Sequence, residues 1–142
     1  MYDNDYFFYM GYAYGHELPN IQPADNIFQW AIVNNKNKVI GWFAYRIQPE
    51  TDTAYNFGFY SFDRGNPIIG RDIFKKMEDL VKEHHRVEWR MIGDNPVQKH
   101  YDKFCEKHNG NRVHLHQVCK DTHGQYHDEY IYEIVKNSTA LI

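Results

Sequence analysis

The sequence has few cysteines, no long apolar run and only a small net charge. Its two cysteines, Cys105 and Cys119, are too few for a disulfide scaffold and predict free thiols. No apolar run approaches the roughly 20 residues of a membrane-spanning helix, and the first eight residues lack the pattern of a signal peptide. A formal charge of −3 excludes a general electrostatic attraction to nucleic acid or to anionic lipid. We therefore expect a cytoplasmic protein whose partners include neither nucleic acid nor a membrane.

Aromatic residues are abundant, at 17% of the 142 residues, and many of them lie in runs typical of strands. Three such runs, joined by short polar turns, predict an antiparallel meander over residues 28–33, 39–47 and 54–62. The second run is nearly all apolar or aromatic, which predicts a strand covered on both faces. Gly58 in the third run suggests a bulge or the close approach of another backbone.

The spacing of the apolar residues then changes to three and four, which predicts helices. One helix is expected over residues 67–84 and another over residues 96–109, with a short strand at residues 86–92 between them. Two further strands, at residues 112–119 and 126–135, complete the order β-β-β-α-β-α-β-β. This order predicts an α/β fold with a mixed sheet.

We take residues 1–142 as one domain, because the chain contains no repeat and no linker-like segment. Its core is expected over residues 27–136, preceded by an aromatic segment at residues 1–26. Within that segment, residues 6–13 carry aromatic and apolar side chains at helical spacing, which suggests a short helix. The last six residues are expected to be frayed.

Both predicted helices begin with Asn-Pro, which places Asn66 and Asn95 at the N-caps and a proline at each first helical position. Good capping alone accounts for either start. The first helix also has Gly70 in its opening turn, and glycine weakens a helix by about 1 kcal/mol relative to alanine. Close approach of a ligand is one reason for a glycine there. Since helix N-termini bind anions, and Arg64 and Arg71 lie nearby, a phosphate site is the alternative.

The order of elements over residues 28–135 resembles the GCN5-related N-acetyltransferases, the GNAT superfamily. In that family a pyrophosphate-binding loop of pattern Gln/Arg-x-x-Gly-x-Gly/Ala opens the first of these helices. Here Gly70 matches the last position of the pattern, and Arg64 lies one position before the expected basic residue. The family also places some 50 residues ahead of the meander, whereas only 26 precede Ile27. The missing first strand leaves a sheet edge that a second copy of the chain would cover.

A second part of the resemblance follows the fourth strand. The family has an Asn after this strand, a Tyr in the next helix and then a Gly, and Asn95, Tyr101 and Gly110 resemble them. The interval from Asn95 to Tyr101 is one residue shorter than usual, so that Asp102 occupies the family's tyrosine position.

The resemblance implies that acetyl-CoA binds where the third and fourth strands splay apart. Its pantetheine would lie along residues 57–62, and its pyrophosphate would meet backbone amides of residues 64–71. The resemblance implies these cofactor-binding residues: Phe59, Tyr60, Phe62, Arg64, Gly65, Asn66, Ile69, Gly70, Arg71 and Asn95.

The implied activity is that of an acyltransferase, in which an amine attacks the thioester of acetyl-CoA directly. Tyr101 would give a proton to the departing thiolate, and Glu88 is a candidate for the base that deprotonates the amine. The acceptor is either a small-molecule amine or a protein amino group. The alternative is a catalytically inactive GNAT-like module that binds CoA or a protein partner.

Two other kinds of site are suggested by single groups of residues. A cluster near the end of the chain suggests zinc, although it lacks the CxxC and HExxH patterns; its members are His114, His116, Cys119, His123 and His127. Because isolated histidines on a hairpin are usually surface residues, we expect no metal. Cys105 near His108 suggests a thiol nucleophile, but its place on the apolar face of the helix favours a buried structural cysteine.

Overall fold

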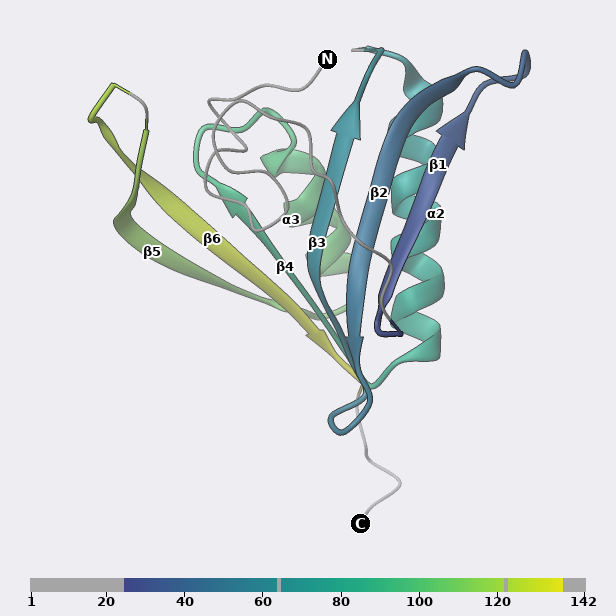
Figure 1. Cartoon of the computed structure of the whole chain (residues 1–142). Coiled ribbons are helices and arrows are strands. Elements are labelled where there is room, and N and C mark those ends of the chain that lie inside the picture. Colours follow the sequence, from purple (N-terminus) through teal and green to yellow (C-terminus); the bar gives the residue numbers. More distant parts are fainter. Residues whose placement is uncertain (1–24, 64, 122, 137–142) are drawn as a thin grey trace.

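Six strands and two helices make up residues 25–63, 65–121 and 123–136, the part of the chain that the computed structural model describes. Both helices lie on one face of the sheet (Figure 1). The elements are β1 (Ile27–Val33), β2 (Val39–Gln48), β3 (Thr53–Ser61), α2 (Pro67–Glu83), β4 (Arg86–Ile92), α3 (Gln98–Lys107), β5 (Asn111–Lys120) and β6 (Tyr126–Val135). Their order confirms the predicted α/β fold. The suggested helix at residues 6–13 and the tail at residues 137–142 lie outside the described residues.

The strands lie in the order β1-β2-β3-β4-β6-β5, and every neighbouring pair is antiparallel except β3 and β4. That parallel pair has only two residue pairs, Thr53 with Arg86 and Ala54 with Val87. Beyond them the two strands diverge, so that the sheet opens like a V (Figure 1). We call β1–β3 with α2 the meander half, and β4, β6 and β5 with α3 the hairpin half.

A bulge in β3 lies close to the point of divergence. Ala44 pairs with Gly58 and Arg46 pairs with Tyr55, so β3 holds one more residue than β2 in between. Asn56 lies in this bulge with a φ of 55°, in the left-handed region that asparagine tolerates better than most residues. The predicted bulge in this strand is therefore confirmed, but it is centred on Asn56 rather than on Gly58. An added residue bends a strand and increases its twist, which helps β3 to leave β4.

The core lies between the sheet and the two helices. Spacing along α2 predicts an apolar stripe of five residues. Four of them are buried, namely Ile69, Ile73, Met77 and Leu80, and the fifth, Val81, is partly buried against the core. α3 contributes Tyr101, Phe104 and Cys105. Phe74 of α2 joins the two sets, because its ring packs 5.8 Å from that of Tyr101 and 5.6 Å from that of Phe104. Neither described helix has the length and apolarity needed to cross a membrane.

The start of α3 differs from the prediction. The helix begins at Gln98, not at the Asn-Pro pair, and its N-cap is Val97 rather than Asn95. Asn95 instead closes a turn, since its side-chain oxygen accepts a hydrogen bond from the backbone N–H of Val97 at 3.0 Å. The turn over Pro96 comes before the first helical residue and delays the helix.

Gly110 follows the end of α3, but it is not the left-handed residue at which helices often end. The left-handed residue there is Asn109, with a φ of 55°. A β-carbon on Gly110 would lie 2.5 Å from the carbonyl oxygen of Glu133 and 2.7 Å from the sulfur of Cys105. Close packing against β6 and α3 therefore requires a glycine at this position.

Candidate functional site

Tyr101 of α3 lies across the divergence of β3 and β4. Its ring meets Phe59 of β3 at 6.5 Å and Trp89 of β4 at 5.9 Å between centroids, edge-on in both cases. The side chain is buried, and this burial raises the pKa of the phenol well above its usual value. The Tyr101 ring therefore bridges side chains of the two strands on the side of the helices, and its hydroxyl stays protonated.

The predicted residues of the third strand lie on both faces of β3. Phe59 faces the helices, whereas Tyr60 lies on the opposite face beside Trp42, with ring centroids 5.4 Å apart. Phe62 follows the end of the strand and is 40% exposed. A ligand that lies along β3 therefore meets Phe59 on the side of the helices, whereas the side chain of Tyr60 is buried on the other side.

Asn66 caps α2 as predicted. Its side-chain oxygen accepts a hydrogen bond from the N–H of Ile68 at 3.0 Å, and Pro67 occupies the first helical position. The Asn66 amide also donates to the carboxylate of Asp63 at 2.9 Å. The N–H of Ile69 lies 3.3 Å from the carbonyl oxygen of Asn66. A phosphate at this helix start therefore has to compete with the cap for N–H donors.

The two glycines around this start leave space. Gly65 has a φ of 81°, and a β-carbon on either Gly65 or Gly70 would meet nothing within 4 Å. Ile69 between them points into the core, so only its backbone can face a ligand. Arg71 is exposed and lies 3.4 Å from Asp72. Arg64 lies outside the described residues.

Comparison with known proteins gives a fold but no close relative. The sequence matches no established family profile and no curated protein. Among solved structures, the spermidine/spermine N-acetyltransferase SpeG from Vibrio cholerae matches over 78% of this chain and 66% of its own, with 15% identity and a TM-score of 0.63. The ribosomal-protein-S18-alanine N-acetyltransferase from Escherichia coli matches over 82% and 76%, with 13% identity and a TM-score of 0.62. The chain has the GNAT fold.

A third neighbour is the ribosomal L7/L12 α-N-protein acetyltransferase RimL, solved in complex with coenzyme A. It matches over 78% of this chain, with 17% identity and a TM-score of 0.59. The matched region spans only 62% of the RimL chain. The chain therefore shares the GNAT fold with a part of RimL and of SpeG, and not with their full lengths.

Within this GNAT fold, Asp102 is directed away from the diverging strands. Its carboxylate is 3.1 Å from a guanidinium nitrogen of Arg112 and accepts a hydrogen bond from the hydroxyl of Tyr132 at 2.7 Å. Asp102 thus binds α3 to the terminal hairpin, while Tyr101 lies at the divergence. α3 begins at Gln98, later than predicted. With this start, Tyr101 faces β3 and β4 although it lies one residue closer to Asn95 than the family pattern has it.

Glu88 lies on the face of β4 opposite the helices, since the next residue, Trp89, packs into the core on the helical side. Its carboxylate is 2.6 Å from Arg86 and 3.9 Å from Arg90. Arg86 also binds Glu133 at 2.8 Å, so Glu88 belongs to a ladder of ion pairs along β4 and β6. The structure does not bring Glu88 together with Tyr101, which faces the other side of the sheet.

Cys105 has no histidine to activate it among the described residues. Its thiol is buried, which raises its pKa, and it lies 3.6 Å from the carbonyl oxygen of Asn111. His108 instead contacts Glu78 through Nε2 at 2.6 Å. The structural interpretation of Cys105 fits this arrangement, and the thiol nucleophile does not.

The histidines of the terminal hairpin separate into different environments. His114 and His116 share one face, as predicted, and both approach Asp128, a residue that the sequence analysis did not single out. His127 contacts Asp121 at 2.8 Å instead. Cys119 lies with Glu129, 4.0 Å from its carboxylate, and burial raises the pKa of the thiol to about 11. Asp128 was missed because cross-strand register, which fixes its position opposite the histidines, cannot be read from spacing along one strand.

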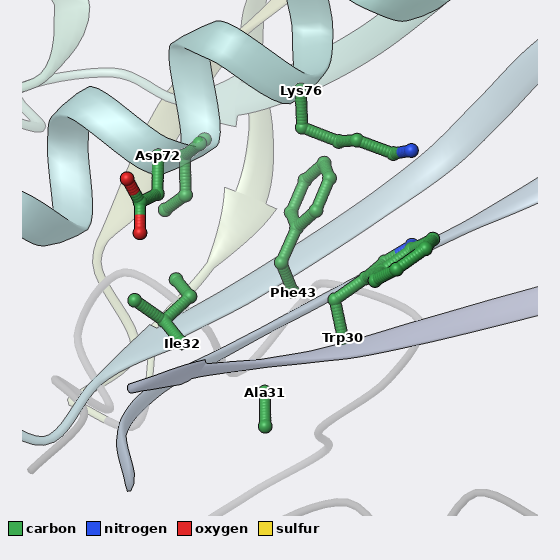
Figure 2. A pocket seen from close by; sticks show the side chains of 7 residues that line it. Trp30, Ala31, Ile32, Phe43, Asp72 and Lys76 are labelled. Carbon is green, nitrogen blue, oxygen red and sulfur yellow. The ribbon is translucent and has the colours of Figure 1, made fainter. Parts of the chain in front are cut away.

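A pocket of about 170 Å³ lies at the other edge of the sheet, between β1, β2 and α2 (Figure 2). Trp30 forms one wall, and the ammonium of Lys76 lies 4.3 Å from its ring centroid. The remaining lining residues are Ala31, Ile32, Phe43, Asp72 and Ile73. This volume is below the roughly 300 Å³ at which most ligand pockets begin, and the pocket lies away from the divergence of β3 and β4.

Proposed function

We propose that the chain is an acyltransferase that moves the acetyl group of acetyl-CoA to an amine. The observation that carries the proposal is the position of Tyr101 between the diverging β3 and β4 of a GNAT fold. RimL, one of the structural neighbours, was solved with coenzyme A. We assign acetyl-CoA to the divergence of β3 and β4 in this chain, and the reaction to the cytoplasm.

The residues proposed to bind acetyl-CoA surround β3 and the start of α2. Phe59, Tyr60 and Phe62 would line the pantetheine on β3. The open space at Gly65 and Gly70 would admit the pyrophosphate. The remaining proposed contacts are Arg64, Asn66, the backbone of Ile69, Arg71 and Asn95.

The proposed reaction is a direct transfer. A neutral amine attacks the thioester carbonyl, the carbon–sulfur bond breaks, and the thiolate takes a proton from the hydroxyl of Tyr101. Trp89 beside Tyr101 has a buried indole N–H with no hydrogen-bond partner among the described residues, which fits a site that receives a carbonyl oxygen. Glu88 is proposed as the base that deprotonates the amine, on the face of the sheet opposite the helices. There the ammonium group of the substrate would take the place of Arg90, which lies 3.9 Å from Glu88, whereas Arg86 lies 2.6 Å away.

The acceptor is proposed to be a small-molecule amine or a protein amino group. The structural neighbours include enzymes named for each kind, spermidine for SpeG and ribosomal proteins for the other two. We also propose a second copy of the chain as the partner of β1, which is an edge strand of the described sheet and carries Trp30 at 46% exposure. Light scattering at several protein concentrations tests that assembly.

Calorimetry with acetyl-CoA, followed by an assay of CoA release with a panel of amines, tests the function. We expect binding and amine-dependent release. In Gly70→Val the branched side chain fills the space at the start of α2, so binding should weaken at least tenfold. Gly70→Ala serves as the smaller control and should retain more of the affinity.

Each negative result has a defined meaning. Binding without transfer to any amine would favour the inactive module over the enzyme. The absence of acetyl-CoA binding would overturn the proposal and leave an interaction module. Unchanged affinity in a folded Gly70→Val protein would remove the start of α2 from the site.

A further inference from the structure

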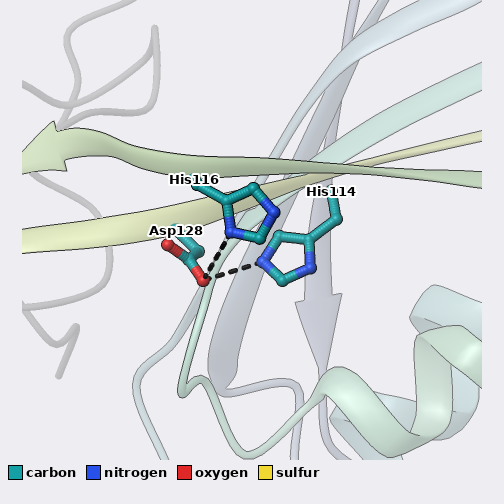
Figure 3. A group of neighbouring side chains, drawn as sticks. All are labelled: His114, His116 and Asp128. Carbon is teal, nitrogen blue, oxygen red and sulfur yellow. Dashed lines mark hydrogen bonds and ion pairs between the residues drawn. The ribbon is translucent and has the colours of Figure 1, made fainter.

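His114, His116 and Asp128 form a compact group on the terminal hairpin (Figure 3). One oxygen of Asp128, Oδ2, lies 2.7 Å from Nε2 of His114 and 3.9 Å from Nδ1 of His116. The three ligand atoms all lie within 4.8 Å of one another. The hairpin therefore presents two imidazole nitrogens and one carboxylate oxygen around a common point.

A bulge in β5 builds this arrangement. Leu115 pairs with Glu129 and Cys119 pairs with His127, so three residues of β5 lie opposite Asp128 alone. Gln117, inside the bulge, has a φ of 52°, and its N–H donates a hydrogen bond to Oδ1 of Asp128 at 2.8 Å. Because Oδ1 is held by the backbone, the other oxygen is turned toward the histidines.

The surroundings also orient the first histidine. The ring of His114 packs 4.4 Å from that of Tyr130, its cross-strand partner, and 4.1 Å from that of His116. Asp128 is further fixed through its carbonyl oxygen, which accepts a hydrogen bond from Gly93 at 2.7 Å. Of the contacts around the group, the hydrogen bond from Gln117 to Oδ1 of Asp128 is of the kind that orients a carboxylate ligand in metal sites.

Although the sequence alone led us to expect no metal, we propose that His114, His116 and Asp128 bind a zinc ion. Two imidazoles and one carboxylate are a donor set that zinc accepts, whereas calcium and magnesium favour sites made of oxygens. Tetrahedral zinc at about 2.0–2.1 Å from each donor separates its ligands by about 3.3 Å. The observed separations lie on both sides of this value, and His116, whose side chain is 76% exposed, has the freedom to move inward.

The bound ion would link β5 to β6 across the bulge and leave its fourth position to water. The site lies on residues that have no part in the proposed acetyl transfer, so zinc binding and acetyl transfer succeed or fail independently. A ligand that binds only the folded chain raises its melting temperature.

Calorimetric titration of the full chain, purified without a histidine tag, with zinc chloride tests the site. We expect one high-affinity zinc ion per chain and a zinc-dependent rise in melting temperature. His116→Ala and Asp128→Asn should each weaken binding at least tenfold. Cobalt, added in place of zinc, should give the visible absorption of a four- or five-coordinate ion in the unmodified chain, and His116→Ala should lose it.

The matched control is His127→Ala, which removes an imidazole of the same hairpin that is held by Asp121 instead. It should leave the zinc affinity unchanged. The proposal is overturned if no stoichiometric zinc binds, if His116→Ala binds zinc as tightly as the unmodified chain, or if the control loses as much affinity as His116→Ala. Circular dichroism without zinc confirms that each variant is folded.

Discussion

The meander half and the hairpin half present different chemistry on the face opposite the helices. In the meander half this face carries aromatic side chains, with Trp42 packed on Tyr60 and hydrogen-bonded to Gln29. In the hairpin half it carries the ladder of ion pairs in which Arg86 binds both Glu88 and Glu133. The two halves share one sheet, yet only two residue pairs of the strand ladder join β3 to β4. A change from aromatic to charged side chains on this face therefore coincides with the line along which the strands separate.

Polar contacts hold the two halves at a fixed divergence. At the narrow end, the carboxylate of Asp52 contacts Nδ1 of His84 at 2.8 Å and the N–H of His85 at 3.0 Å. Between the helices, Glu78 of α2 contacts both Lys107 and His108 at 2.6 Å. Since β3 and β4 pair at only two positions, the contacts of Glu78 and the aromatic packing around Phe74 add links between the two halves.

Gly110→Ala should produce the largest loss of stability and should act on the hairpin half. The new methyl group would press on the carbonyl oxygen of Glu133, a backbone atom that cannot turn aside. We expect a loss of about 3 kcal/mol, at the upper end of the usual cost of overpacking. Urea unfolding measures it. A loss below about 0.5 kcal/mol would show that β6 and α3 shift apart easily.

Tyr101→Phe should have the next largest effect, on turnover rather than on stability. It keeps the ring that bridges Phe59 and Trp89 and removes only the hydroxyl, so turnover should fall roughly 10²-fold while acetyl-CoA affinity stays nearly the same. Tyr132→Phe is the control, because it removes a hydroxyl that binds Asp102 within the hairpin half. Full turnover in Tyr101→Phe would restrict this residue to packing between the halves.

Asp52→Asn should weaken the narrow end in a pH-dependent way. Hydrogen bonds from His84 and from the backbone of His85 hold the pKa of Asp52 below its usual value. The unfolded-state pKa is about 3.9, so this stabilisation is complete above that value and is lost as the pH falls through the lower folded-state pKa. Urea midpoints between pH 7 and pH 2 should therefore depend less on pH in Asp52→Asn than in the unmodified chain. Parallel curves would mean that the junction does not depend on this charge.

Gly70→Ala should have the smallest effect, and of opposite sign to Gly110→Ala. A methyl group at Gly70 meets nothing within 4 Å, and alanine favours a helix over glycine by about 1 kcal/mol. We expect a gain of up to about 1 kcal/mol in the same urea assay. A loss would indicate that the start of α2 is constrained in a way that the space around Gly70 does not reveal.

The order of elements could be predicted because it depends on local patterns. β4 and β6 have the predicted bounds, and Asn66 caps α2 as its Asn-Pro start suggests. The same dipeptide at Asn95 gave a wrong prediction of the start of α3, which begins at Gln98. Whether a turn or a helix follows Asn-Pro depends on how the chain leaves β4. The bulge at Asn56 was also misplaced, since register is decided by pairing with β2 and not by the one glycine in the run.

The candidate site residues also differ in how far the sequence predicted them. Tyr101 was named from the resemblance to the GNAT family, although it lies one residue before the family's tyrosine position, and its ring contacts side chains of both β3 and β4. The group of His114, His116 and Asp128 depends on a bulge that adds two residues to β5 opposite Asp128. The residue types alone do not indicate this bulge. Cys119 and His127 were grouped with the histidines by closeness in sequence, but the hairpin separates them.

The placement of β6 between β4 and β5 has a consequence for how the chain folds. The three strands of the meander half pair with their neighbours in sequence, so their contacts close short loops. β4 pairs with β3 at only two residues, so most of its hydrogen bonds are with β6. β6 comes after α3 and β5 along the chain. Contacts between distant segments form slowly since a long loop must be closed first. The first half of the sheet should thus assemble early, and β4 should gain protection from hydrogen exchange only when β6 docks beside it.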